Sequence, residues 1–336
     1  MAEYSYSDAN TLTEVGREKM RTLEQDDPIF GYFPIEEKDV SVISWEQEDA
    51  DTGLQQIRGM NGAPKRVKAL DSKRYTVDPG VFGEFRVLDE KELTERRKLG
   101  TTDQLIDVDD LVAKEQDRLL GRENDRIRVI LWLLVTKGQY NLSSETGHLI
   151  YAAAFAFPSF TASVAWSDLE NSTPLADIRN LKLQGIDLVT DADFGSPGKL
   201  FLNQKKVSQM LANKNEDDLG GRFKGISAAR GLARVNEILV EEGLPTIVEH
   251  NGSYVDDSGT KQRMIPDDAG VLFGARREKM GSYTMTRNAT NPNAEPGPYD
   301  EVIENKRPPK TIEVHRGHNG GAEVHFGKSI QRLAGI

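Results

Sequence analysis

The chain has 336 residues, of which 37% are hydrophobic and 29% are charged, and its net charge is −11. It contains no cysteine, which excludes disulfides, zinc–thiolate sites, cysteine-ligated iron–sulfur clusters and thiol catalysis. The negative charge argues against tight binding to nucleic-acid phosphates and fits a container wall, although an acidic solvated surface without a function explains it equally well.

The N-terminal region begins without the basic and apolar segments of a signal peptide, so we predict none. A weak helical pattern covers Leu12–Leu23. An apolar arm follows at residues 27–35, and its two prolines disfavour a regular helix. Because such an arm cannot bury itself locally, we predict that it packs on another part of the molecule or on a neighbour.

A long polar excursion follows the arm. Val40–Trp45 partly alternates between apolar and polar residues, and Arg74–Val77 and Phe82–Leu88 have similar patterns, so all three are predicted strands. Between them, Glu46–Lys73 is rich in glycine and charged residues. We predict that residues 39–88 form an exposed β-hairpin, with a disordered loop as the alternative.

A long amphipathic helix is predicted from about residue 102 to 137. Thr101 and Gln104 have capping-box spacing, and Gly138 can end the helix in the left-handed conformation. Such a helix would be about 54 Å long. The alternative is a core helix of an α+β enzyme.

An uncharged run, Leu149–Trp166, follows the helix and is interrupted by Pro158. We predict two buried strands, Leu149–Phe157 and Phe160–Trp166, and no membrane span. Alternating patterns then predict a compact α/β unit over 167–275. Its elements are helices at Leu175–Leu183, from Ser196 to Leu211 and at Ser227–Glu242, strands at Gly185–Thr190, Thr246–His250 and Gly270–Gly274, and a hairpin at Tyr254–Pro266.

The C-terminal part begins with a proline-rich loop or crossover at 286–311. Thr311–His315 and Ala322–Phe326 then alternate, and we predict a terminal strand pair joined by a turn at Gly317–Gly321.

Candidate chemistry is sparse. His315, His318 and His325 could bind zinc if a hairpin brought them together, but alternating polar residues are also the ordinary wet face of a strand. Gly195–Lys199 lacks the first glycine and the final Ser/Thr of a phosphate-binding loop. We therefore predict no catalytic residues, no cofactor and no metal site.

Several segments, in this order and spacing, resemble one known family, the lambda-type major capsid protein of tailed phages (major capsid protein E family, HK97-like fold). The segments that carry the resemblance are Asp27–Ile35, Ile43–Glu46, Lys137–Tyr140, Ser196–Lys199, Tyr254–Val255, Met264–Asp267 and Val271–Gly274. The C-terminal segment, with its histidine- and glycine-rich turn, departs most from the family pattern.

The resemblance implies an α+β, HK97-like capsid fold. Its expected parts are an N-terminal arm (1–38), an extended β-hairpin E-loop (39–88), a peripheral domain with the spine helix (89–166), an α/β axial domain (167–275) and a return to the peripheral domain with C-terminal strands (276–336). Predicted inter-subunit contacts are Phe30, Tyr32, Phe33, Trp45, Leu54, Ile57 and Met60.

The expected function is that of a structural subunit of an icosahedral phage capsid, assembled from pentamers and hexamers in the host cytoplasm, located in the virion and enclosing double-stranded DNA. Expected partners are further copies, a scaffolding protein, a portal protein, possible decoration proteins and DNA contacted weakly and non-specifically, with no membrane. The alternatives are an encapsulin-like nanocompartment shell and a metal-dependent enzyme using His315, His318 and His325.

Overall fold

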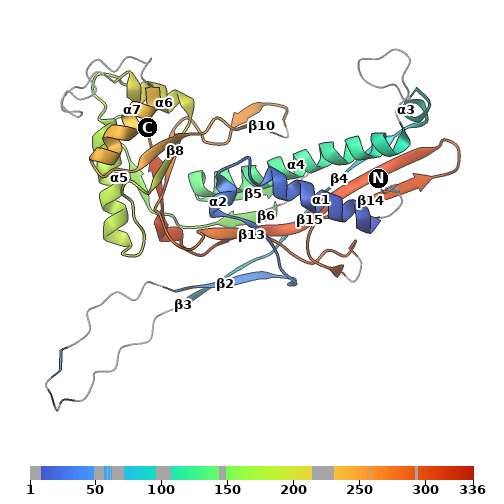
Figure 1. Cartoon of the computed structure of the whole chain (residues 1–336), viewed down its shortest axis with the longest axis horizontal. Helices are drawn as coiled ribbons and strands as arrows, with labels where there is room; N and C mark the ends of the chain where they lie inside the picture. Colours follow the sequence, from blue (N-terminus) through green and yellow to red (C-terminus); the bar gives the residue numbers. More distant parts are fainter. Residues whose placement is uncertain are drawn as a thin grey trace.

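The structure is a computed structural model that describes residues 9–48, 57–58, 60, 62, 72–95, 107–143, 149–213, 231–256, 258–291 and 294–336. The subunit is elongated (Figure 1). A long helix and a first sheet form most of its length, a second sheet with its helices occupies one end, and a hairpin projects to the side. Within the described ranges, none of the helices combines the length and apolar character that crossing a membrane requires.

The described helices are α1 (Ala9–Leu23), α2 (Ile29–Tyr32), α3 (Glu90–Glu95), α4 (Val108–Lys137), α5 (Pro174–Leu188), α6 (Gln204–Leu211) and α7 (Gly231–Glu241), with a 3₁₀ turn at Gly327–Ser329. The described strands are β1 (Ile35–Glu37), β2 (Ile43–Glu48), β3 (Ser72–Val77), β4 (Gly80–Leu88), β5 (Gln139–Ser143), β6 (Leu149–Ala154), β7 (Ser159–Thr161), β8 (Lys199–Leu202), β9 (Thr246–Glu249), β10 (Ser253–Val255), β11 (Lys261–Arg263), β12 (Ala269–Phe273), β13 (Gly281–Met285), β14 (Tyr299–Asn305), β15 (Thr311–Val324) and β16 (Ile330–Ala334).

The first sheet is built around β15. Strand β4 runs antiparallel along one side of it, from Gly80 opposite Gly320 to Leu88 opposite Ile312. On the other side, β14 pairs with the first half of β15 and β13 pairs with the second half. Strand β1, at the end of the N-terminal arm, adds to β13 in parallel. The chain's N-terminal and C-terminal segments thus share one sheet.

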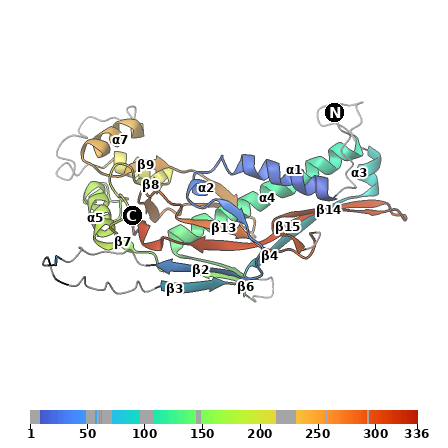
Figure 2. The ribbon, with the colours of Figure 1, turned by 60° about the horizontal axis from the view of Figure 1, so that its bottom comes forward.

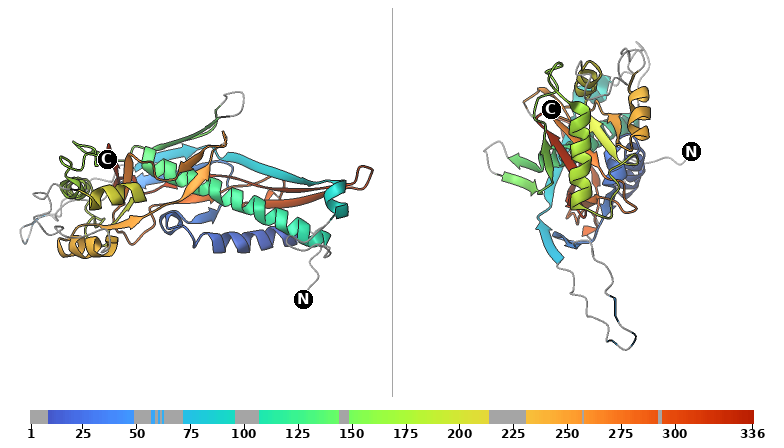
Figure 3. Two further views of the ribbon diagram at one scale, coloured as in Figure 1. Left: turned by 90° about the horizontal axis from the view of Figure 1, so that it is seen from above. Right: turned by 90° about the vertical axis from the view of Figure 1, so that its left-hand side faces the viewer.

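The second sheet has the strand order β7-β16-β12-β8-β9. Apolar side chains of α5, α6 and α7 share one core with its strands, and α5 crosses the end of the molecule (Figure 3). The final strand β16 pairs with β12 and β7. The last residues, for which the sequence analysis predicted no strand, therefore belong to the second sheet.

Helix α4 spans the long body and has defined ends. The side chain of Asp107 accepts a hydrogen bond from Val108 N at 2.6 Å, which satisfies an otherwise unpaired amide of the first turn. Gly138 is left-handed with φ 76°, and its N–H donates to Leu134 O at 2.7 Å, as its position in the sequence predicted. The predicted start near residue 102 and the Thr101–Gln104 pair lie outside the described residues.

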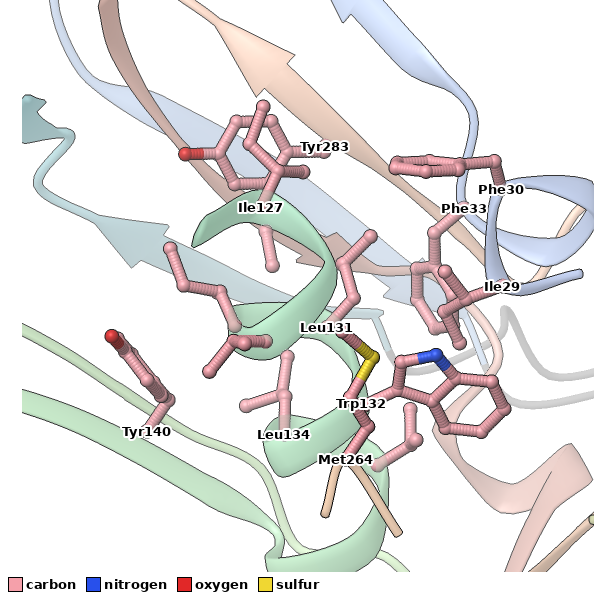
Figure 4. Packing of buried hydrophobic residues seen from close by; sticks show 14 of the residues in the cluster. Ile29, Phe30, Phe33, Ile127, Leu131, Trp132, Leu134, Tyr140, Met264 and Tyr283 are labelled. Carbon is pink, nitrogen blue, oxygen red and sulfur yellow. The ribbon is translucent and has the colours of Figure 1, made fainter. Parts of the chain in front are cut away.

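The main hydrophobic core lies between α4, the N-terminal arm and the first sheet (Figure 4). Ile127, Leu131 and Leu134 of α4 point into it at helical spacing and are fully buried. Trp132 lies against the Phe201 ring, with the ring centroids 5.4 Å apart. This core continues to residues of the second sheet such as Phe201 and Phe273, so the two sheets are packed together rather than merely tethered.

A buried charged network lies between α4 and the inner face of the first sheet. Arg316 of β15, 2% exposed, pairs with Glu123 of α4 and with Asp300 of β14. His318 Nδ1 lies 2.6 Å from Glu123 Oε1, and its Nε2 lies 2.9 Å from the Tyr283 hydroxyl. We refer to Glu123, Asp300, Arg316 and His318 as the buried network.

Charge balance sets the acidity of the two carboxyls in the buried network. Burial alone would raise the pKa of Glu123, but Arg316 and His318 outweigh it, so the pKa lies below its ordinary value. For Asp300, burial outweighs the attraction of Arg316 and raises the pKa. Glu123 is therefore the carboxylate that the fold keeps most firmly ionised beside Arg316.

Gly16 of α1 packs directly over the buried network, and we predict that Gly16→Ala destabilises the subunit. An added Cβ would contact Arg316 Nη1 and would lie 2.7 Å from Asp300 Oδ2. These atoms are held by buried ion pairs, so overpacking of about 1–3 kcal/mol is expected to outweigh the gain of about 0.5–1 kcal/mol in helix propensity.

Gly121→Ala in α4 is the matched control, because a Cβ at Gly121 meets nothing within 4 Å. It should raise the free energy of unfolding by about 0.5–1 kcal/mol. Urea unfolding of unassembled subunits measures both changes. A stabilising Gly16→Ala would show that α1 does not pack on the network as described.

Several predicted elements differ from the structure. The arm contains one helical turn, α2, because the side chain of Asp27 accepts a hydrogen bond from Ile29 N at 3.0 Å and starts the turn between the two prolines. The strand predicted at Gly185–Thr190 is instead the end of α5 followed by an extended residue. Gly185 lies on the buried side of this helix, where the ring of Phe194 approaches to 2.7 Å of an added Cβ and leaves no room for a side chain.

The helix predicted from Ser196 to Leu211 is wrong in its first half. Residues 199–202 form β8, a central strand of the second sheet, and α6 begins only after Asn203, whose side chain accepts from Lys206 N at 3.0 Å. The run Leu149–Trp166 contains two shorter strands, β6 and β7, and β7 is mostly exposed rather than buried as predicted. The elements at Leu12–Leu23, Thr246–His250, Tyr254–Pro266 and Gly270–Gly274 are confirmed within a few residues.

The glycine-rich turn predicted at Gly317–Gly321 is wrong, because β15 runs through it without a break. Gly317 faces Gly83 of β4 so closely that an added Cβ would lie 2.7 Å from the Cα of Gly83 and 2.8 Å from the hydroxyl of Tyr299. Glycine is needed here for close approach of neighbouring strands rather than for a turn. Strand β14, within the region predicted as a crossover, is its partner.

Candidate assembly surfaces

The arm residues predicted as inter-subunit contacts lie in the subunit's own core. Phe30 and Phe33 are buried beside Ile29 and pack toward α4 (Figure 4). Tyr32 stacks on Phe273, with ring centroids 4.2 Å apart, and burial raises its pKa to about 12. The structure thus gives all three an intramolecular role, and their contact with a neighbouring subunit stays a prediction.

Asp27 fixes the arm to the spine helix. Its Oδ1 accepts from Trp132 Nε1 at 3.1 Å and its Oδ2 accepts from Arg128 Nε at 2.8 Å. His250 stacks on Trp132 with ring centroids 4.5 Å apart, and burial together with Arg128 outweighs the attraction of Asp27 and lowers the pKa of His250. The arm, α4 and the loop after β9 therefore meet at one carboxylate, which the sequence did not single out.

The β2–β3 hairpin is fastened at its base by Trp45. The indole Nε1 donates to Val324 O of β15 at 2.8 Å, and the ring stacks on Tyr75 of β3 with centroids 5.6 Å apart. Beyond this base the two strands stay paired from Ile43–Val77 to Glu48–Ser72. Trp45 therefore orients the hairpin relative to the first sheet.

Farther out, Arg58 Nη1 donates a hydrogen bond to Gly62 O within the excursion at 3.0 Å. Ile57 and Met60 are fully exposed. Leu54 lies outside the described residues. Two large apolar side chains in water are an unfavourable arrangement for a lone chain, and they leave apolar surface for another molecule to cover.

On the side of the first sheet away from α1 and α4 (Figure 2), the part formed by β4, β15 and β14 carries exposed apolar side chains. It is defined by Val81, Phe85 and Val87 of β4 and Ile303 of β14, all exposed. Phe85 stacks on His315 with ring centroids 4.9 Å apart, and Val87, Glu313 and Ile303 lie in one row across three strands. We call these four apolar residues the outer sheet face.

The sequence analysis missed the outer sheet face. The signal was present in β4, where Val81, Phe85 and Val87 alternate with the inward residues Phe82 and Leu88, so that both faces carry apolar side chains. A strand with two apolar faces indicates burial on both sides, and in this subunit only one side is covered.

The three candidate histidines do not come together. His315 points to the outer sheet face and lies 3.1 Å from Glu313 Oε2, whereas His318 points inward into the buried network. His325 lies past the end of β15, with its Nε2 3.6 Å from Glu323 Oε2. Among the described residues, no three His, Asp or Glu side chains are grouped as a metal site would require.

Comparison with known proteins identifies a family. The profile described as phage major capsid protein E matches residues 30–315, which is most of the chain. No curated protein matches the chain significantly.

Two solved structures share the fold. A capsid protein of a prophage from E. coli CFT073, described as putative, is 13% identical with a TM-score of 0.55, and the match covers 79% of this chain and 80% of that one. A phage-related protein from Bordetella bronchiseptica RB50 is 10% identical with a TM-score of 0.56, covering 98% of both chains. These likenesses confirm the α+β, HK97-like capsid fold expected from the sequence.

Proposed function

The chain belongs to the phage major capsid protein E family and is a structural subunit of a phage capsid, and we propose that it assembles as pentamers and hexamers into an icosahedral shell enclosing double-stranded DNA. The observation that carries this proposal is the family match over residues 30–315. The nanocompartment and metal-enzyme alternatives are not favoured by it.

The shape of the subunit supports assembly with copies of itself. Two apolar surfaces are exposed in the single chain. One is the projecting hairpin with Ile57 and Met60, and the other is the outer sheet face. In a closed symmetric lattice every copy offers both surfaces, so each apolar surface can be covered at once. We propose that the hairpin of one copy lies on the outer sheet face of the next, with Ile57 and Met60 near Phe85.

Charge complementarity supports the same pairing. Arg58, beside Ile57, is exposed, and Glu301 and Glu313 lie on the outer sheet face in the rows of Phe85 and Val87. A cationic hairpin tip would meet carboxylates there, which fixes the register of a contact more than it adds affinity. Leu54 belongs to this proposal as well, and contact of Phe30, Tyr32, Phe33 and Trp45 with a neighbouring subunit stays a prediction.

The remaining assignments are also proposals. A structural role needs no catalytic residue or cofactor. The shell would assemble in the host cytoplasm and then become the capsid of the virion. A scaffolding protein, a portal protein and decoration proteins would contact the shell, and the net charge of −11 would keep contact with packaged DNA weak and non-specific.

Negative-stain electron microscopy with light scattering on the purified full chain tests the function, alone and co-expressed with the genes next to its own. We expect uniform closed particles or ring-shaped capsomers in at least one of these preparations. Small monodisperse monomers in every preparation would contradict the proposal.

A further inference from the structure

The described methionines divide into one exposed side chain and a buried set. Met60, on the excursion beyond β2, has a relative exposure of 103%, which is full exposure. The exposures of the other described methionines lie between 0% and 8%, and these residues are Met20, Met210, Met264, Met280 and Met285. Met1, the remaining methionine of the chain, lies outside the described residues. Among the described thioethers, Met60 is therefore the one that a reagent dissolved in water reaches first.

The buried methionines are held in the two large cores. Four of them pack in the main core, and Met210 packs in the core of the second sheet. A reagent reaches those sulfur atoms only when the fold opens locally, whereas the sulfur of Met60 requires no opening. The hydrogen bond from Arg58 Nη1 to Gly62 O spans Met60 along the chain but leaves its side chain in water. The fold thus separates Met60 from the other described methionines by access rather than by chemistry.

Oxidation of the thioether by a peroxide is the chemistry that this exposure permits. The sulfur attacks one oxygen of hydrogen peroxide, the O–O bond breaks and an S–O bond forms, so that the sulfur is oxidised to a sulfoxide and the peroxide is reduced to water. The chain has no cysteine, whose thiolate would react with the same oxidant. Met60 therefore has no competing thiol within its own subunit.

The sulfoxide changes what the hairpin offers to another molecule. Unoxidised methionine is a flexible apolar side chain that adapts well to an apolar contact surface. Oxidation makes the same side chain polar, and its new oxygen requires a hydrogen-bond donor wherever it is buried. The outer sheet face is apolar at Val81, Phe85, Val87 and Ile303, so burying the sulfoxide against it is unfavourable.

We propose that Met60 is a site of modification by peroxide, and that its sulfoxide prevents a subunit from joining a shell. The inference rests on the proposed function, because it uses the contact between the hairpin and the outer sheet face. Every copy in a closed lattice repeats that contact, so a small loss at each copy is multiplied over the shell. Assembly in turn covers Met60 and protects it. A peroxide therefore discriminates between free subunits and finished shells.

Peptide mapping by mass spectrometry measures which methionine gains an oxygen atom. Full-length subunits are treated with hydrogen peroxide before assembly, and assembled particles are treated in parallel. Met60 of free subunits should be oxidised at least about tenfold faster than any buried methionine, and at least about tenfold faster than Met60 in particles. Trypsin releases residues 59–65 as a peptide with Met60 as its single methionine, so Met60 is measured separately from Met1. Comparable rates for Met60 and the buried methionines would overturn the inference.

Particle yield measures the consequence of the modification. Oxidised parent subunits should give at least about tenfold fewer closed particles than untreated subunits, and methionine sulfoxide reductase with a thiol reductant should restore the yield. Met60→Leu keeps an apolar side chain without sulfur, so its yield should resist peroxide. Met210→Leu replaces the most exposed of the buried methionines and is the matched control, which should stay as sensitive as the parent. A Met60→Leu chain that lost its yield on treatment as the parent does would contradict the proposal.

The two measurements separate this inference from the proposed function. If untreated parent chains formed no particles, the shell function would fail, while selective oxidation of Met60 would still establish the modification site. If Met60 were oxidised selectively and the particle yield did not fall, the shell function would stand and the effect on assembly would be refuted. Equal oxidation of Met60 in subunits and in particles would show that assembly does not bury this side chain, and the protection that we infer would be wrong.

Discussion

Glu123→Ala is expected to lower the free energy of unfolding of the unassembled subunit by about 3–5 kcal/mol, because it removes one partner from a buried ion pair. Arg316 would keep only Asp300, and His318 would lose the carboxylate that lies 2.6 Å from its Nδ1. A buried guanidinium cannot turn to water to replace the lost partner. Urea unfolding followed by tryptophan fluorescence measures the change.

Glu84→Ala is the control for the Glu123 experiment, because Glu84 pairs with Arg122 at the exposed edge of the same helix–sheet contact. Glu84→Ala should lower the free energy of unfolding by less than about 1 kcal/mol. Equal losses in the two variants would mean that the buried network contributes no more than a surface pair.

The effect of Glu123→Ala should also depend on pH. The pKa of Glu123 is lowered in the folded subunit. Its contribution to the free energy of unfolding is therefore complete above its unfolded pKa of about 4.3, and it is lost as the pH falls through the lower pKa of the folded state. The difference in free energy of unfolding between the parent and Glu123→Ala should therefore be largest near neutral pH and should shrink in acid.

Shortening the β2–β3 hairpin is expected to abolish closed particles while leaving a folded subunit. Residues 49–71 would be replaced by Asn-Gly, a two-residue turn that can join β2 directly to β3. The Trp45 hydrogen bond to Val324 and the strand pairing below the turn would remain, so the subunit core should keep its stability. Loss of particles by electron microscopy, with an unchanged far-ultraviolet circular dichroism spectrum, is the expected result.

Point variants separate the length of the hairpin from its side chains. Ile57→Asp with Met60→Asp should lower particle yield, because charges would enter the proposed apolar contact with the outer sheet face. Val255→Asp, exposed on β10, is the matched control and should assemble normally. If the variant with the shortened hairpin formed normal shells, the hairpin would not be an assembly contact.

Family membership and the broad plan of the fold could be inferred from sequence because they rest on local signals. The end of α4 at Gly138, the strands of the hairpin and the apolar arm each depend on residue types within a few positions of one another. Capping, helical periodicity and proline placement act over that range, so a single sequence contains the information.

The same reasoning did not find the buried network as a site. Glu123 and Arg316 are 193 positions apart, and each taken alone resembles an ordinary charged surface residue. His318 was considered as a metal ligand with His315, although one residue faces inward and the other outward on β15. A histidine's role follows from its neighbours in space, which the sequence does not provide.

By itself, the sequence determined the capsid family, the long spine helix, the absence of cysteine chemistry and the existence of an arm and a hairpin. The predicted hairpin strand Phe82–Leu88 is instead β4 of the first sheet, paired with β15. Only the tertiary structure decided that the arm packs inward, that Gly317 lies within a strand rather than a turn, and that residues 199–202 form a central strand. The physical reason is that helix ends and turns are stabilised by contacts close in the chain. Strand pairing and the burial of a face depend on partners that are distant in the chain, and their free energy appears only once the fold has formed.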